Sequence, residues 1–272
     1  RQALNTVSPG DTIIAQDAVN TYAVPDLGAN KERMTNLTIS GERDDASGAI
    51  FDAGGGPFTW GLDGETVIEK ITLQNGTNVD VGHYWGEFNW ATPGLLVPLL
   101  GADVTVRNCI FRDHNVVRIH GGFCGVRFDN EVDTAIAFEN CLFHHFTWKG
   151  SWGHTGALFW VDRGNVVDVS FTNCTFYNGE TTNLPEAMIY EEDVLNMTIT
   201  LTNSIFYTAG SIPFIVSRNN FVPDAAHCCF HNFSSSPSGT GVITSDPLFV
   251  DGPNRNFRLR PTSPCRDTGT LV

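Results

Sequence analysis

The sequence predicts an all-β protein built as a right-handed parallel β-helix, a solenoid in which short strands wind into stacked coils. Two observations predict it: a strand-like segment recurs along the chain, and each copy ends in a residue suited to a sharp turn. The clearest copies reach that turn at Asn108, Asn140, Asn173 and Asn203. Each copy alternates apolar and polar residues and is rich in Val, Ile, Thr and Phe, which indicates strands and excludes helical repeats.

The turn residues are expected to form an asparagine ladder. A sharp bend between two strands of one coil needs a left-handed backbone, which Gly adopts freely and Asn, Asp and His adopt more readily than other residues. Stacked about 4.8 Å apart, their amides can hydrogen-bond along the stack. The predicted turn residues are Gly41, Asn75, Asn108, Asn140, Asn173, Asn203 and His227.

A single domain is predicted for residues 1–272, with about seven to eight coils. Residues 1–36 are expected to form an N-terminal cap and first coil, residues 37–245 the regular coils, and residues 246–272 the last coil and cap. The drifting distance between copies suits a solenoid whose loops differ in length.

Two inward rows follow from the register, one of small thiol or hydroxyl side chains and one of phenylalanines. Parallel side chains in a stack are poorly aimed for disulfides, so free buried thiols are expected in the first row. Cys229 should point away from the core and pair with Cys265 or with another chain. The first row comprises Cys109, Cys141, Cys174, Ser204 and Cys228. The second comprises Phe111, Phe143, Phe176, Phe206 and Phe230.

These repeats resemble the right-handed parallel β-helix superfamily, the pectin-lyase-like fold, and most of all its cell-surface members related to polymorphic outer-membrane proteins. Pro9–Ile14 resembles the first-coil motif of that superfamily, and residues 245–269 resemble the closing motif of bacterial extracellular members. The resemblance implies an extracellular or cell-surface location. It leaves the chemistry open, because this fold serves lyases, hydrolases, adhesins and filaments alike.

The charge and hydropathy of the chain argue against some classes of binding partner. The chain has 16 Lys and Arg residues against 30 Asp and Glu residues, a net charge of −14. This balance argues against nucleic acid or anionic lipid as a partner. The longest apolar run, Gly94–Leu100, is too short for a transmembrane segment.

Two outward rows are expected to lie on the surface. The first is small and rich in hydroxyl groups, and the second, which mixes aromatic and charged side chains, should be either covered by a loop or a contact surface. The hydroxyl row comprises Thr38, Thr72, Thr105, Ala137, Ser170 and Thr200. The mixed row comprises Arg112, His144, Tyr177, Tyr207 and His231.

Aromatic residues in and near two long turns, residues 76–93 and 146–155, are candidates for binding carbohydrate, because exposed aromatic rings stack on sugars. If both turns lie on one side, they would wall a groove beside the mixed row. The candidate sugar-binding residues are Trp85, Trp90, Trp148, Trp152, Tyr177 and Tyr207.

Charged and histidine side chains in and near this groove are the candidates for catalysis. A polysaccharide lyase needs a base and a group that neutralises the uronate carboxylate, often calcium, whereas a glycoside hydrolase needs two carboxylates facing one groove. The recognisable signatures of pectin lyases and hydrolases are absent from the sequence. The catalytic candidates are Arg112, His144, Lys149, Asp113 and Glu87. An acidic row of Asp129, Asp162 and Glu191 is a candidate calcium site.

The favoured function is therefore a structural or adhesive protein of the cell surface that binds other copies of itself, or a cell-surface or polysaccharide partner. Its strand edges at both ends favour filaments. The alternative is a carbohydrate-active enzyme, either a polysaccharide lyase or a glycoside hydrolase, or a glycan-binding module that uses the Trp-rich turns.

Overall fold

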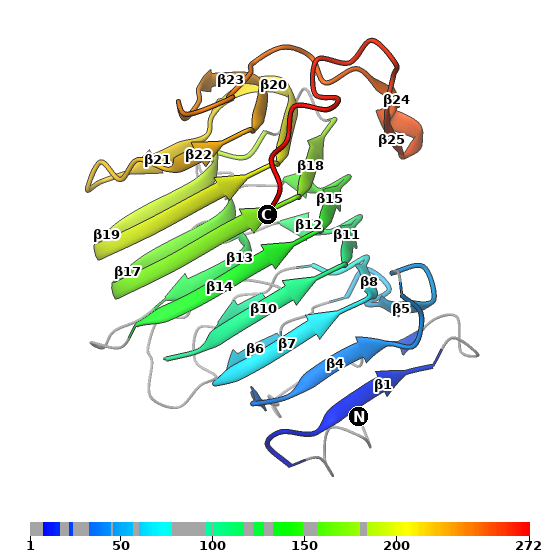
Figure 1. The fold of residues 1–272 in the computed structure, drawn as a ribbon. Helices are drawn as coiled ribbons and strands as arrows, with labels where there is room; N and C mark the ends of the chain where they lie inside the picture. Colours follow the sequence, from blue (N-terminus) through cyan, green and yellow to red (C-terminus); the bar gives the residue numbers. More distant parts are fainter. Residues whose placement is uncertain are drawn as a thin grey trace.

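The chain folds as a parallel β-helix, as predicted (Figure 1). The computed structural model describes residues 8–16, 22–23, 33–44, 46–56, 60–77, 96–98, 101–116, 122–127, 133–148, 157–179 and 184–272. Each coil passes through three sheets, named here sheet 2, sheet 1 and sheet 3 in the order in which the chain visits them. Eight successive coils each add one strand to sheet 1, which agrees with the predicted number of coils.

The strands of the coils pair in parallel with their equivalents in neighbouring coils. Sheet 1 contains β1 (Thr12–Ala15), β4 (Thr38–Gly41), β7 (Glu65–Glu69), β10 (Asp103–Arg107), β14 (Thr134–Glu139), β17 (Ala157–Thr172), β19 (Ala187–Thr202) and β22 (Asp224–Ala226). Sheet 2 contains β3 (Arg33–Thr35), β6 (Trp60–Asp63), β9 (Leu96–Pro98), β13 (Gly122–Arg127), the first parts of β17 and β19, and β21 (Ile215–Ser217). Sheet 3 contains β2 (Tyr22–Ala23), β5 (Ala49–Asp52), β8 (Ile71–Gln74), β11 (Ile110–Arg112), β15 (Leu142–His144), β18 (Thr175–Asn178), β20 (Ile205–Pro213) and β23 (Cys229–Ser235).

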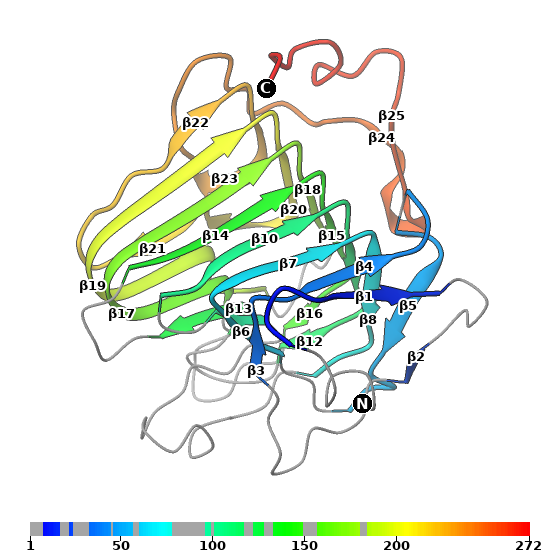
Figure 2. The same ribbon diagram turned by 60° about the horizontal axis from the view of Figure 1, so that its bottom comes forward.

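Three features depart from this three-sheet pattern. Strands β17 and β19, with 16 residues each, bend from sheet 2 into sheet 1 and join them (Figure 2). Two short strands, β12 (Asn115–Val116) and β16 (Thr147–Trp148), form a separate parallel pair after sheet 3. After the last coil, β24 (Phe249–Asp251), a 3-10 turn (Gly252–Asn254) and β25 (Asn256–Leu259) form an antiparallel hairpin. No helix in the described ranges is long and apolar enough to cross a membrane.

The corner between sheet 1 and sheet 3 carries the predicted ladder. Asn108, Asn140, Asn173 and Asn203 all have a left-handed backbone, with φ of 54°, 53°, 55° and 51°, and His227 continues the row with φ of 54°. The side-chain amide of Asn203 donates to Oδ1 of Asn173 over 3.1 Å. These residues therefore turn the chain where the sequence predicted.

The predicted position of Asn75, in the ladder with Asn108, was wrong. Because β7 pairs with β10, the residue that stacks on Asn108 is Lys70, which is left-handed with φ of 58°. Asn75 follows β8 in sheet 3 and belongs to a second left-handed corner with Asp113 and His145, with φ of 56°, 59° and 57°. The segment that ends at Asn75 resembles the other copies of the repeat more closely than the segment that ends at Lys70 does. The sequence therefore placed Asn75 at the corner that Lys70 occupies.

The same difference between the predicted and the observed register changes the membership of the predicted hydroxyl row. Thr72 is buried in sheet 3, where its hydroxyl donates to the carbonyl of Ala46 over 2.8 Å, and Val67 takes its place beside Thr105. Gly41 lies at the predicted corner but is not left-handed. It is required there because a Cβ would collide with the carbonyl oxygen of Lys70.

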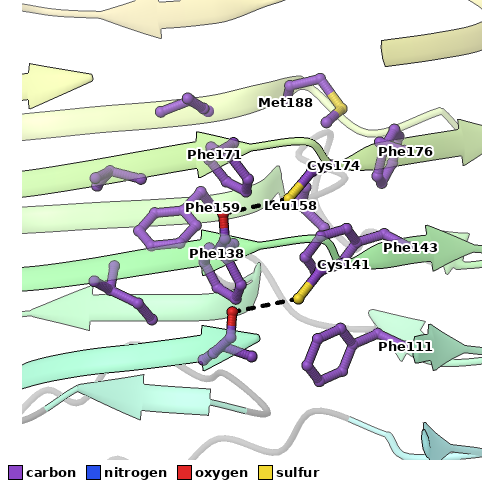
Figure 3. Close-up of a cluster of buried hydrophobic side chains, with 14 of the residues drawn as sticks. Phe111, Phe138, Cys141, Phe143, Leu158, Phe159, Phe171, Cys174, Phe176 and Met188 are labelled. Carbon is purple, nitrogen blue, oxygen red and sulfur yellow. Dashed lines mark hydrogen bonds between the residues drawn. The ribbon is translucent and has the colours of Figure 1, made fainter. Parts of the chain in front are cut away.

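Phenylalanines fill the interior in the predicted inward row (Figure 3). Phe111 stacks on Phe143 with ring centroids 5.1 Å apart, and Phe206 stacks on Phe230 at 5.3 Å. Such stacked rings combine a large buried area with favourable ring geometry. The solenoid core is thus continuous along the axis.

The cysteines of the other inward row are free and buried, as expected. Cys141 Sγ lies 3.4 Å from the carbonyl of Val106 in the preceding coil, and Cys174 Sγ lies 3.4 Å from that of Phe138 (Figure 3). Burial raises the pKa of the Cys141 thiol, so these residues act as small apolar side chains with weak donors.

Candidate functional site

The mixed outward row of sheet 3 is the structural basis of the candidate site. Its strands align in one register, so the five side chains stack along one face. The rings of Tyr177 and Tyr207 are stacked 4.9 Å apart, and Tyr207 stacks on His231 at 5.1 Å. The row comprises Arg112, His144, Tyr177, Tyr207 and His231, as predicted.

The C-terminal hairpin β24–β25 covers much of this row (Figure 1). Phe257 packs against Tyr177 and His144, with ring centroids 5.2 Å and 5.0 Å apart, and Phe249 packs against Tyr177 and Tyr207 at 6.0 Å. Of the two outcomes left open by the sequence, coverage by a loop is therefore the correct one for this part of the row.

Three of the predicted sugar-binding or catalytic side chains are buried, either beneath the hairpin or in the core. Tyr177 and His144 are buried beneath the hairpin, and burial raises the pKa of Tyr177 to about 12. Trp148 is wholly buried and packs beside Phe146, because β16 directs it inward. Neither Tyr177 nor Trp148 presents a free face to a sugar ring, which corrects the prediction for both.

Two neighbouring histidines link the row to the hairpin. The Nδ1 atoms of His144 and His145 lie 2.8 Å apart, and Nε2 of His145 lies 3.1 Å from the carbonyl oxygen of Pro253. A carbonyl only accepts, so Nε2 of His145 carries a proton. Burial, and then the charges of His145, Arg255 and Arg112, lower the pKa of His144 to about 3, so His144 stays neutral at ordinary pH.

The accessible end of the row is a cluster of polar and charged groups. Arg112 Nε donates to Oε1 of Gln74 over 2.8 Å, and Gln74 Nε2 donates to Asp52 over 2.6 Å. From the hairpin, Arg255 Nη2 donates to Oδ1 of Asp113 over 2.7 Å. Together these residues form a chain of hydrogen bonds and an ion pair on the surface, here called the arginine cluster.

The arginine cluster contains two guanidinium groups, because Arg255 bonds to Asp113, the residue that follows Arg112. Partial burial, followed by repulsion from Arg255, lowers the pKa of Arg112, although Asp113 and Asp52 oppose this. Each arginine keeps further N–H donors beyond the bond described above, since a guanidinium has five. Although the chain has a net charge of −14, these two arginines provide a local site with donors suited to an anion.

Three described positions from which the chain enters its long connecting segments lie beside this cluster. Thr77 pairs with Asn115, and Asn115 pairs with Thr147, so these residues lie in one row across three coils. The segments 78–95, 117–121 and 149–156 follow this row directly in the chain. Their stems therefore share one side of the solenoid, next to the corner that contains Asp113. The candidates Trp85, Glu87, Trp90, Lys149 and Trp152 lie in these segments, outside the described residues.

The register does not place Glu191 in the predicted acidic row beside Asp162. Asp162 pairs with Glu192 rather than with Glu191, and Asp129 lies outside the described residues. Glu191 is fully buried, and its carboxylate accepts from the backbone N–H of Val194 and from Ser217 and Asn219. It fastens two loops and is not free for calcium. Across the described ranges, no group of three His, Cys, Asp or Glu side chains is placed to hold a metal.

Sequence reasoning missed Gln74 and Arg255. Gln74 precedes Asn75, which the sequence places at the other corner, and Arg255 lies 142 residues from its partner Asp113, so no local pattern connects those two.

Comparisons with known proteins find distant similarity in structure alone. No family model matches the chain, and no curated protein matches it. Two solved structures of alginate lyases are similar: AlyF-OU02, with 15% identity, 87% of this chain covered and a TM-score of 0.47, and a PL6 alginate lyase bound to a trisaccharide, with 14%, 85% and 0.42. The chain spans 58% and 56% of their lengths. A trypsin-treated variant of QnrB1, a fluoroquinolone resistance protein, is more distant, with 10% identity, 89% of this chain and 96% of that protein covered, and a TM-score of 0.26.

Proposed function

We propose that this protein binds an acidic polysaccharide at the arginine cluster and acts on it as a polysaccharide lyase. The observation that carries the proposal is that Arg255 bonds to Asp113, the residue after Arg112, which brings a second guanidinium to the side of the solenoid that holds Thr77, Asn115 and Thr147. Guanidinium groups recognise carboxylates through paired, charge-assisted hydrogen bonds. The aromatic residues in the turns would add stacking faces for the sugar rings.

Lyase chemistry suits this cluster better than hydrolysis. A glycoside hydrolase needs two available carboxyl groups, but Asp113 is paired with Arg255, and Asp52 accepts from Gln74 and Asn75. In a lyase, Arg112 would neutralise the uronate carboxylate while a base removes the proton on the adjacent carbon. The bond to the leaving glycosidic oxygen then breaks, a carbon–carbon double bond forms, and the leaving oxygen takes a proton. Lys149, which directly follows β16, is the candidate base.

Substitution of Arg112 tests this function. Arg112→Gln should weaken binding of alginate or polygalacturonate by about 10- to 100-fold, because a hydrogen bond to a charged group contributes about 1.5–3 kcal/mol. Calorimetry measures the affinity, and the ultraviolet absorbance of the unsaturated product measures cleavage. The matched control is Arg43→Gln, at an exposed position in the turn after β4. Unchanged affinity in Arg112→Gln, or equal affinity for a neutral glucan, would show that the proposal is wrong.

Self-association is a second proposed role, favoured by one observation at the N-terminal end. Strand β1 pairs with β4 on one side, no strand of the described residues pairs with its other edge, and Ile14 on β1 is 54% exposed. An unpaired strand with an apolar side chain favours pairing with another chain.

A further inference from the structure

The C-terminal segment folds back onto the last coils and brings two cysteines together. Cys229 begins β23 in the last coil, and Cys265 lies beyond the hairpin. Both are free thiols in this structure, and they lie close enough that each shifts the pKa of the other, upward for Cys229 and downward for Cys265. Of the two partners that the sequence left open for Cys229, the fold thus places the one in the same chain beside it.

Independent contacts fix this meeting on both sides. Cys229 Sγ lies 3.3 Å from the carbonyl oxygen of Ser245. The backbone N–H of Cys265 donates to Oγ of Ser263 over 3.1 Å, and that hydroxyl donates to the carbonyl of Pro247 over 2.6 Å. Both cysteines are therefore held against the same short stretch, residues 245–247.

The tail beyond Cys265 is also fastened to the β-helix. The backbone N–H of Thr270 donates to Oδ1 of Asn203 over 2.8 Å, and Nδ1 of His227 lies 2.8 Å from the carbonyl of Thr268. These contacts use the top of the asparagine ladder. They hold Cys265 in place from its C-terminal side, as Ser263 does from the other.

Only one of two adjacent cysteines takes part: Cys229, the first residue of β23, and not Cys228, which precedes the strand. Cys228 belongs to the inward row, where its Sγ lies 3.3 Å from the carbonyl of Ala226. Successive side chains of a strand point to opposite faces, so Cys229 faces away from the core that Phe230, the next residue of β23, enters. This alternation makes Cys228 a natural control for Cys229.

We propose that Cys229 and Cys265 form an intramolecular disulfide that fastens the C-terminal segment to the last coil of the β-helix. The bond closes a loop of residues 229–265, which contains the whole β24–β25 hairpin. Cross-linking a long loop restricts the unfolded chain and stabilises the folded one. It also anchors the hairpin that covers the mixed outward row.

The chemistry is a thiol–disulfide exchange with a disulfide-containing oxidant. The neighbouring Cys229 thiol lowers the pKa of Cys265, which makes Cys265 the attacking thiolate. It displaces one thiolate from the oxidant and forms a mixed disulfide. Cys229 then loses its proton and attacks the sulfur of Cys265, which releases the second thiolate. Overall, two protein thiols are oxidised, and the oxidant is reduced to two thiols.

The experiment oxidises the reduced, full-length chain with glutathione disulfide. Remaining thiols are alkylated after denaturation, and the unreduced protein is digested and measured by mass spectrometry. We expect a cross-linked pair of peptides that contain Cys229 and Cys265, lighter by two hydrogens, while Cys109, Cys141 and Cys174 are alkylated. The oxidised protein should melt about 5–15 °C higher than the reduced protein.

Because Cys228 and Cys229 are adjacent, variants assign the bond. Cys228→Ser should keep the cross-link and the shift in melting temperature, whereas Cys229→Ser and Cys265→Ser should lose both. A cross-link that persists in Cys229→Ser would overturn the proposal. So would a Cys265 that carries only glutathione, or a covalent dimer on a non-reducing gel.

Discussion

At the scale of single residues, buried polar groups connect neighbouring loops of this solenoid. His114 accepts from the backbone N–H of Gly76 through Nδ1 over 3.0 Å, and its Nε2 lies 3.1 Å from the carbonyl of Leu73. The carbonyl only accepts, so Nε2 carries the proton and the ring is neutral. Glu191 plays a similar part near β21. Such groups tie together segments that carry no apolar signal in the sequence.

His114 predicts how stability depends on pH. Burial lowers its pKa to about 4, from an ordinary value of 6.5. Between these pH values the unfolded chain binds the proton more readily than the folded chain. The contribution of His114 to the free energy of unfolding is therefore complete above about pH 6.5 and decreases towards pH 4, by about 1.4 kcal/mol per pH unit. Urea unfolding at several pH values measures the slope. His114→Asn should make the slope shallower, leaving the part due to His144, and an unchanged slope would contradict this assignment.

At the scale of elements, the corners decide how much of the fold the sequence could predict. The asparagine corners were predictable because a left-handed turn restricts the residue type, and this correctly placed the rows that follow β10, β14, β17 and β19. Lys70 was missed because Lys has no such preference. The hairpin cover was also missed, since its contacts with Tyr177 and Asp113 join segments far apart in the chain. The site was therefore predictable on sheet 3 and not on the segment that packs over it.

The corner at Lys70 can be improved. Lys70→Asn should raise the free energy of unfolding by about 0.5–1 kcal/mol, because Asn adopts the left-handed backbone with less strain. The ion pair that is lost, with the exposed Asp44 at 3.8 Å, contributes little. Chemical denaturation measures the change. Thr105→Asn, on the strand β10, is the control and should bring no gain; a loss of stability in Lys70→Asn would refute the strain at this corner.

The β24–β25 hairpin should depend on Phe249, which is buried between the hairpin and the two tyrosines. In the reduced protein, Phe249→Ala should release the hairpin and speed tryptic cleavage after Arg258 by about tenfold or more, since losing a buried Phe costs about 3–5 kcal/mol. Val250→Ala is the control, because Val250 is 41% exposed and should leave the rate unchanged. Circular dichroism checks that the coils stay folded. Equal cleavage in both variants would show that the ring does not hold the hairpin.

At the scale of the whole molecule, the two ends of the solenoid differ. Residues 240–243 cover the last coil: the N–H of His227 donates to the carbonyl of Thr240, and the N–H of Phe230 to that of Ile243. An open filament needs two complementary edges, and at this end residues 227–230 already bond to residues 240–243, which covers part of the edge. Pairing of two copies through β1 needs only the N-terminal edge. We therefore expect two copies to pair through β1 as a two-fold dimer, in place of the filament that the sequence favoured.

The exposed Ile14 tests this mode of association. Sedimentation velocity over a wide range of concentrations should show monomers and dimers in equilibrium and nothing larger. Ile14→Lys should abolish the dimer, because a charged side chain on an edge strand opposes pairing with a second strand. Leu195→Lys is the matched control, since Leu195 is 78% exposed on β19, away from that edge. Growth beyond the dimer would favour a filament after all, and a dimer that survives Ile14→Lys would place the contact elsewhere on the molecule.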